Sequence, residues 1–300
     1  MPYDSSRNDK GDDKESWGGN PFAAPKAEVD EIRGEAGEYA LLPESNRLAA
    51  GAGIAWIREG WALMRGHIWA WIGMGFLCML ILAVLQLISI PVSIRGFLQI
   101  LSAPVFIAGL MLVCRAKEQN EDVRVLFLFA GFSKRTGSLL LLGLLDFLLL
   151  LLAVMLTSAG FFLLFKLALV YEFFAGGSRN VPFWQVILFL ALFIFAVIPF
   201  LIVQGLSPQL AALHEDMTAW GAFKLAVRGM LRNILPFLAS GIAFFILPVV
   251  VLGIVFYALG NSAQILFWAQ ISLCLCASFL IPFNYCVFYA AYRDIFIRPR

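Results

Sequence analysis

Residues 138–167 read SLLLLGLLDFLLLLLAVMLTSAGFFLLFKL, an almost continuous apolar run with one acidic residue, Asp146, inside it. A helix needs about 20 apolar residues to cross roughly 30 Å of hydrocarbon, so this run is longer than a bilayer requires. It predicts a membrane-spanning helix that either tilts or breaks near Gly160 and continues along the outer interface.

Five other apolar segments are also long enough to cross a bilayer. They are residues 68–90, 94–113, 183–206, 234–259 and 265–292. Hydrophobic residues make up 61% of the chain and charged residues 14%, against roughly 45–50% and about 25% in soluble domains. A soluble fold could not cover so much apolar surface with polar groups. We therefore expect an all-α, polytopic membrane protein with six transmembrane helices.

The basic residues are distributed unevenly among the loops. If the N-terminus is cytoplasmic, the inner segments beyond residue 100 contain eleven Lys and Arg residues, and the outer loops contain only Arg95 and Arg179. Cytoplasmic loops carry the excess of Lys and Arg in membrane proteins. This asymmetry predicts that both the N- and C-termini lie in the cytoplasm.

The first part of the chain differs in charge from the rest. Residues 1–50 contain eleven acidic and six basic residues, a net charge of −5, whereas the remainder has a net charge of +7. We expect residues 1–47 to form a disordered acidic tail and residues 48–300 to form the membrane domain. Inside the tail, NPFAAPKAEV (Asn20–Val29) is interpreted either as a linker or as a docking motif for a cytoplasmic protein partner.

Three short stretches, 54–68, 123–132 and 220–231, show helical spacing of apolar residues and each precedes two spans. They predict three hairpins, each preceded by a cytoplasmic interfacial amphipathic helix. Thr218 is a candidate N-cap for the third helix. The apolar stripe of that helix is predicted to contain Trp220, Phe223, Val227, Met230 and Leu231.

The positive charge of the membrane domain suits an anionic lipid surface, because the cations are spread among the spans. No pattern typical of nucleic-acid binding accompanies them, so we expect membrane lipids as partners and no nucleic acid. The candidate contacts for anionic lipid headgroups are Arg65, Lys134, Arg135, Lys224, Arg228 and Arg232.

Asp146 is the main candidate for a polar site inside the membrane. A charge at that depth costs at least ~2.5–3.5 kcal/mol, so the carboxyl group must be neutral or paired. Asn284 and Tyr285 lie at a similar depth in the sixth predicted span. The sequence leaves two interpretations open, a structural hydrogen bond between helices or a proton or ligand site.

The sequence contains no pattern typical of an enzyme, a cofactor site or a metal site. The glycine patterns of nucleotide-binding loops and the motifs of serine hydrolases and zinc proteases are absent. His214 is followed by Glu215 and Asp216, but this group lacks the i, i+4 spacing of a helical zinc site. We expect no catalytic residues, no metal and no cofactor.

Several strings resemble an uncharacterised family of proteobacterial six-helix inner-membrane proteins. They are AWIREGWALMRGHIWAW (55–71), APVFIAGLMLVCRAKE (103–118), LFAGF (128–132), AFKLAVRGMLRNILPF (222–237) and YAAYRDIF (289–296). The family is loosely similar to the membrane domain of glycerophosphodiester phosphodiesterases, whose catalytic barrel this chain has no room for. The resemblance implies a bacterial inner-membrane location and supplies no activity or active-site residues.

Two functions follow from these observations. The first is a non-enzymatic inner-membrane protein that acts as a lipid-contacting scaffold or accessory factor in envelope homeostasis. The alternative is a small-molecule or lipid transporter that uses the intramembrane Asp146. A transporter requires a polar cavity near the middle of the membrane, whereas a scaffold does not. The sequence does not indicate an oligomeric state.

Overall fold

The fold is described from a computed structural model of the chain. The chain divides into two units, Met1–Ala40 and Leu41–Arg300, and the structure describes residues 41–42, 44–121, 123–133, 135–175, 183–259 and 265–297 of the second. The candidate docking motif Asn20–Val29 and the candidate lipid contact Lys134 lie outside the described residues.

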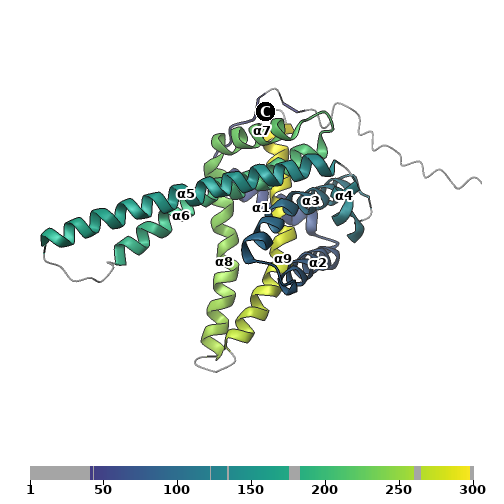
Figure 1. The fold of residues 1–300 in the computed structure, drawn as a ribbon. Helices are drawn as coiled ribbons and strands as arrows, with labels where there is room; N and C mark the ends of the chain where they lie inside the picture. The colour runs from purple at the N-terminus through teal and green to yellow at the C-terminus, as the bar shows by residue number, and fades with distance from the viewer. Residues whose placement is uncertain are drawn as a thin grey trace, which may run out of the picture. The chain divides into compact units, whose positions relative to one another are not determined.

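Every regular element of the described residues is helical (Figure 1). The first helices are α1 (Ala52–Met64), α2 (Ile68–Leu87) and α3 (Val92–Glu118). A short 3₁₀ helix, η1 (Val125–Phe129), and α4 (Ala130–Ser133) follow. The remaining elements are α5 (Thr136–Ala175), α6 (Phe183–Leu213), α7 (Ala219–Arg232), α8 (Ile234–Leu259), α9 (Ile265–Tyr292) and a π-helical turn, η2 (Arg293–Ile297).

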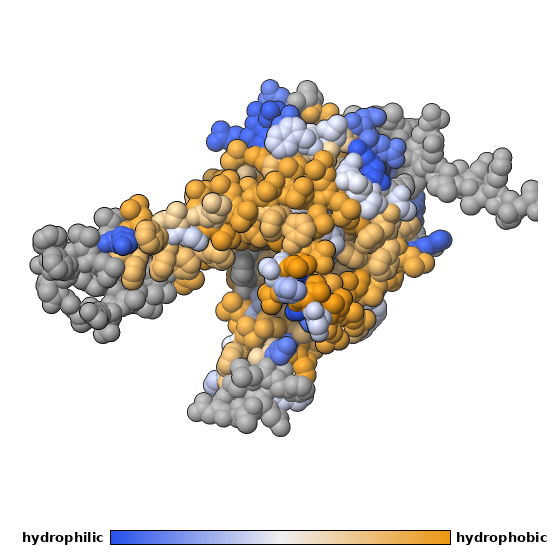
Figure 2. Space-filling model, viewed as in Figure 1, coloured by the Kyte–Doolittle hydropathy of each residue, from blue (hydrophilic) through white to orange (hydrophobic). Residues whose placement is uncertain are grey.

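Six of these helices, α2, α3, α5, α6, α8 and α9, are long and apolar enough to cross a membrane. This confirms the expectation of an all-helical chain with six candidate spans. Their outer surfaces are covered with apolar side chains (Figure 2), as for Trp69, which is 84% exposed. Such surfaces would be unfavourable in water and are expected where lipid is the solvent.

α5 is longer than the sequence analysis anticipated. It is continuous from Thr136 to Ala175, 40 residues, which corresponds to about 60 Å at 1.5 Å per residue. Of the two alternatives, a tilted helix or a break near Gly160, the break does not occur. The reason is that a single glycine costs a helix only about 1 kcal/mol, and Phe161 and Phe165 continue the helix by packing on each other, with ring centroids 6.3 Å apart.

The helices form two clear antiparallel pairs, α5 with α6 and α8 with α9. α2 packs mainly against α9 rather than against its neighbour in sequence, α3, and α1 packs against α8 and α9. The first two predicted spans are therefore consecutive in the chain without forming a packed hairpin.

Residues 123–132 do not form the predicted amphipathic α-helix. They form η1 and α4, which fold back along α3. Gly109 and Gly131 make this possible, because a Cβ at Gly109 would collide with the carbonyl of Leu128 and a Cβ at Gly131 with the carbonyl of Val105. Backbone contact at this distance requires glycine, which a pattern of apolar residues alone does not reveal.

The α2–α9 contact gives a test with a matched control. A Cβ at Gly75 would collide with the backbone carbonyl of Ser278, whereas a Cβ at Gly73 would meet nothing within 4 Å. We expect Gly75→Ala to lower the free energy of unfolding by about 1–3 kcal/mol, the usual cost of overpacking. Gly73→Ala should leave it unchanged or slightly higher. Thermal unfolding in detergent compares the two, and equal stability of both variants would contradict this packing.

Candidate functional site

The C-terminal end of α9 carries a series of polar residues that join distant parts of the chain. The Tyr289 hydroxyl donates a hydrogen bond to Oε2 of Glu118 at 2.6 Å. The guanidinium of Arg293 forms an ion pair with the other oxygen, Oε1, of the same carboxylate. Both side chains of this ion pair are about one-fifth exposed, so the attraction is screened less than at an open surface. Glu118 ends α3, and the contacts fix α3 to α9.

Asp294 joins η2 to the start of the described chain. Its Oδ2 accepts a hydrogen bond from Nε1 of Trp56 at 2.9 Å, and its backbone carbonyl accepts one from Nδ2 of Asn46 at 2.8 Å. The next two carbonyls, of Ile295 and Phe296, accept hydrogen bonds from the backbone of residues 46 and 42, both at 2.8 Å. The carbonyls are thus satisfied from outside the helix, where the chain leaves regular α-helical geometry.

Asn233 holds the same N-terminal segment to the corner between α7 and α8. Its Oδ1 accepts a hydrogen bond from the Leu48 amide at 2.8 Å. Its Nδ2 donates to the carbonyls of Asn46 at 2.8 Å and Gly229 at 3.0 Å. The Asn233 side chain is buried, and these three hydrogen bonds connect it to residues 46–48 and to the preceding turn of α7. Residues 41–42 and 44–47, which were expected to belong to the disordered tail, therefore pack against the membrane domain.

Two of the predicted lipid contacts have protein partners. Arg232 forms an ion pair with Glu44 at 3.3 Å and donates to the Ser45 carbonyl at 2.9 Å. Arg135 donates to the carbonyls of three residues at the end of α6 and after it, at distances of 2.6–3.2 Å. Folding brings unsatisfied carbonyls and a carboxylate within reach of both arginines. Their contact with lipid headgroups stays a prediction. The three carbonyls belong to Ala211, His214 and Met217.

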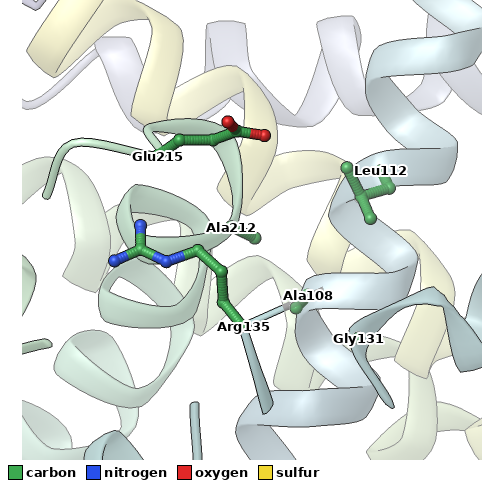
Figure 3. A pocket seen from close by; sticks show the side chains of 6 residues that line it. All are labelled: Ala108, Leu112, Gly131, Arg135, Ala212 and Glu215. Atoms are coloured by element: carbon green, nitrogen blue, oxygen red, sulfur yellow. The ribbon is translucent and has the colours of Figure 1, made fainter. Parts of the chain in front are cut away.

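Arg135 also lines a small cavity between α3, α4 and the end of α6 (Figure 3). The cavity has a volume of about 20 Å³, which is room for about one water molecule. Glu215 lines the opposite side. The cavity is therefore too small for a substrate, and the three carbonyl contacts of Arg135 indicate a structural role for this corner.

His214 lies at the same end of the molecule and is hydrogen-bonded to Tyr292. The distance between its Nε2 and the tyrosine oxygen is 2.6 Å. Burial, reinforced by the nearby charge of Arg115 and opposed by Asp216, lowers the pKa of His214 from 6.5 to about 4. The imidazole is therefore neutral near pH 7. Within the described part of the chain, no group of His, Cys, Asp and Glu residues is arranged to hold a metal ion.

Asp146 is buried in α5, and neither of its carboxylate oxygens has a hydrogen-bond partner among the residues that the structure describes. The predicted hydrogen bond to the sixth span is therefore not formed, because α5 packs chiefly against α6 and α3 rather than against α9. Tyr285 on α9 is close enough to Asp146 to interact with it electrostatically. Asn284 is half-buried on α9, and no contact joins it to Asp146.

The face of α7 that lies outward combines aromatic and basic side chains. Trp220 is 53% exposed and stacks on Phe223 with ring centroids 5.7 Å apart. The Nζ of Lys224 lies 5.7 Å from the centroid of the Trp220 ring. Arg228, one turn further on, is exposed. Aromatic and basic groups combined in this way are typical of helices at the headgroup level of a membrane.

The opposite face of α7 packs on the protein through small side chains. The buried residues of the helix are Ala219, Ala222, Ala226, Gly229 and Met230. The predicted apolar stripe is divided between two environments: Trp220 and Leu231 are exposed, whereas Met230 packs among buried residues of the core. At the neighbouring Gly229 the ring of Phe296 approaches the helix closely. The predicted N-cap is confirmed, since Oγ1 of Thr218 accepts a hydrogen bond from the Gly221 amide at 3.1 Å. Arg65, at the end of α1, is exposed.

A second hollow lies between α5 and α6 and has a volume of about 370 Å³. Its floor contains small residues such as Ala153 and Ala196, and the hydroxyl of Thr157 donates to the Ala153 carbonyl at 2.8 Å. The surrounding residues are apolar. Neither hollow is thus the polar cavity near the middle of the spans that a transporter requires.

Sequence analysis did not single out several residues that organise this end of the molecule. Trp56, Glu118, Asn233 and Asp294 all join segments far apart in the chain. Each lies in one of the strings quoted for the family resemblance. Glu118, Asn233 and Asp294 lie at or next to the ends of predicted spans, which was the available signal, but it did not indicate which residues meet.

Comparison of the chain with family models, with curated proteins and with solved structures gives no match.

The environment of His214 predicts a pH dependence of stability. Because the folded chain lowers the pKa of His214 to about 4, the unfolded chain binds a proton more readily between pH 6.5 and about 4. Stability should therefore fall as the pH falls through this range. In His214→Gln the amide keeps a hydrogen bond to Tyr292 and does not titrate. Thermal unfolding in detergent at several pH values should show a smaller decline for the variant, and an identical decline would contradict the assignment.

Proposed function

We propose that this protein is a non-enzymatic inner-membrane protein that acts as a lipid-contacting scaffold or accessory factor in envelope homeostasis. The observation that carries the proposal is the outward face of α7, on which Lys224 lies against the exposed ring of Trp220. Six apolar helices of sufficient length support a membrane location. The absence of catalytic motifs from the sequence and the resemblance to inner-membrane proteins are consistent with it.

The two faces of α7 explain how the helix would contact lipid. Its small buried residues, such as Ala222 and Ala226, hold the helix against the protein. Trp220 and Leu231, which is 67% exposed, would enter the boundary between headgroups and acyl chains. Lys224 and Arg228 would contact phosphates, each contributing about 1 kcal/mol near an anionic surface.

The proposed topology has six spans and both termini in the cytoplasm. α1 and α7 would lie as interfacial helices before the first and the fifth span. The excess of Lys and Arg in the inner loops supports this orientation. Asn20–Val29 would then be available to a cytoplasmic protein partner. The alternative of a transporter receives less support, because the larger hollow is apolar and the polar one holds about one water.

Reporter fusions test the topology. A cytoplasm-dependent reporter fused after Arg300 should be active, because the C-terminus follows a basic inner segment. A periplasm-dependent reporter inserted near Gly177 should be active as well, because the loop between α5 and α6 is predicted to lie outside. If both positions report from the same side of the membrane, six spans with this orientation are excluded.

The lipid proposal is tested with the full-length protein in nanodiscs. We expect the amides of α7 to exchange hydrogen more slowly with phosphatidylglycerol than with phosphatidylcholine, because Lys224 and Arg228 would bind the anionic headgroups. Added salt should reduce the difference by screening. Lys224→Gln and Arg228→Gln should each reduce it too, as followed by mass spectrometry.

Arg232→Gln is the matched control, since it removes the same charge from the same helix. Arg232 is already paired with Glu44, so its loss should leave the difference between the two lipids largely unchanged. If the amides of wild-type α7 exchange hydrogen equally fast in both lipids, the result contradicts the proposed function. The basic residues of α7 would then only orient the chain in the membrane.

A further inference from the structure

Asp146 is a buried carboxylic acid for which the described residues provide no compensating charge or hydrogen bond. Its side chain is fully buried, and neither carboxylate oxygen has a hydrogen-bond partner among the described residues. An ionised carboxylate in such surroundings is very unfavourable, so a positive species must accompany it. That species is either a proton or a bound cation.

The register of α5 and α6 shows what faces Asp146. A Cβ at Gly160 of α5 would lie 3.8 Å from the Leu192 side chain of α6. The steps from Gly160 to Asp146 and from Leu192 to Leu206 are both fourteen residues, so antiparallel packing places Asp146 level with Leu206. Ser207 is the next residue along α6.

The side-chain directions agree with this register. Leu149, Ala153 and Gly160 line the hollow on α5, and Asp146 continues their stripe, three residues before Leu149 and seven before Ala153. On α6 the hollow is lined by Ala196 and others, and Ser207, eleven residues on, lies on the same helix face. Asp146 and Ser207 therefore lie on the facing sides of the two helices.

Ser207 adds a second unsatisfied oxygen. Its side chain is fully buried, and its Oγ has no hydrogen-bond partner. Pro208 follows it inside α6. Proline has no amide hydrogen, so the carbonyl four residues earlier, that of Gln204, receives no helical hydrogen bond. Gln204 and Ser207 are three residues apart, which places them on the same side of α6.

We propose that the two carboxylate oxygens of Asp146, Oγ of Ser207 and the Gln204 carbonyl bind one Na⁺ ion between α5 and α6. All four atoms are oxygens, the ligands that hard cations prefer. One carboxylate balances one positive charge, so a divalent ion would leave an excess charge in the membrane interior. Neither carboxylate oxygen of Asp146 forms a hydrogen bond with Oγ of Ser207, so a proton does not join the two groups, whereas a metal cation between them would be bound by both. The site does not depend on the proposed lipid contacts of α7.

The test is thermal unfolding of the full-length protein in detergent, with NaCl replaced by choline chloride at constant ionic strength. A ligand that binds only the folded state raises its stability with concentration. We therefore expect the unfolding temperature to rise with Na⁺ and to level off. Asp146→Asn should abolish the rise. Ser207→Ala should weaken the apparent affinity by about tenfold, the effect of losing one ligand worth about 1.4 kcal/mol.

Thr157→Ala is the matched control, because it removes a hydroxyl from the same interface between α5 and α6. That hydroxyl already donates a hydrogen bond to the Ala153 carbonyl. This variant should keep the response to Na⁺ of the wild type. If Asp146→Asn does not fold, radioactive ²²Na⁺ binding to the wild type still tests the site, and about one ion per chain supports it. Equal unfolding temperatures of the wild type in Na⁺ and choline, or an undiminished response in folded Asp146→Asn, would overturn the proposal.

Discussion

The packing of α9 is the constraint on which the other helices depend. α1, α2 and α8 all contact it, and the ion pair between Glu118 and Arg293 fixes its C-terminal end to α3. In lipid the hydrophobic effect does not favour one helix contact over another, so close packing and polar contacts decide which helices meet. Gly75 allows close packing of α2 against Ser278 of α9. The residues of η2 and their neighbours provide the polar contacts.

The basic residues around α7 and the C-terminal end of α9 serve two purposes. Arg135, Arg232 and Arg293 satisfy carbonyls or carboxylates of the protein and join separate segments. Lys224 and Arg228 on α7 point outward. This division explains why a count of cations in the loops overestimates how many of them are available to lipid.

Much of the fold could be predicted from the sequence, because a span is recognised by the length and composition of one segment. The bounds of α8 and α9 were predicted as residues 234–259 and 265–292 and are found there, and the Thr218 cap is confirmed. The partner of Asp146 could not be predicted, since depth in the membrane does not indicate which helices are adjacent. Asn284 of α9 was considered as the partner because it lies at a similar depth, whereas α5, which contains Asp146, packs on α6 and α3.

The sequence by itself determined that this chain has six apolar helices, a polar N-terminal region and an acidic residue in its third span. These properties depend on residues close together in the chain, where hydropathy and helical period suffice. Only the tertiary structure decided that α2 packs on α9, that Arg135 and Arg232 bind protein groups, and that Asp146 is buried without a partner. Contacts between helices depend on which small residues and polar groups face each other across space, and separation along the chain does not encode that.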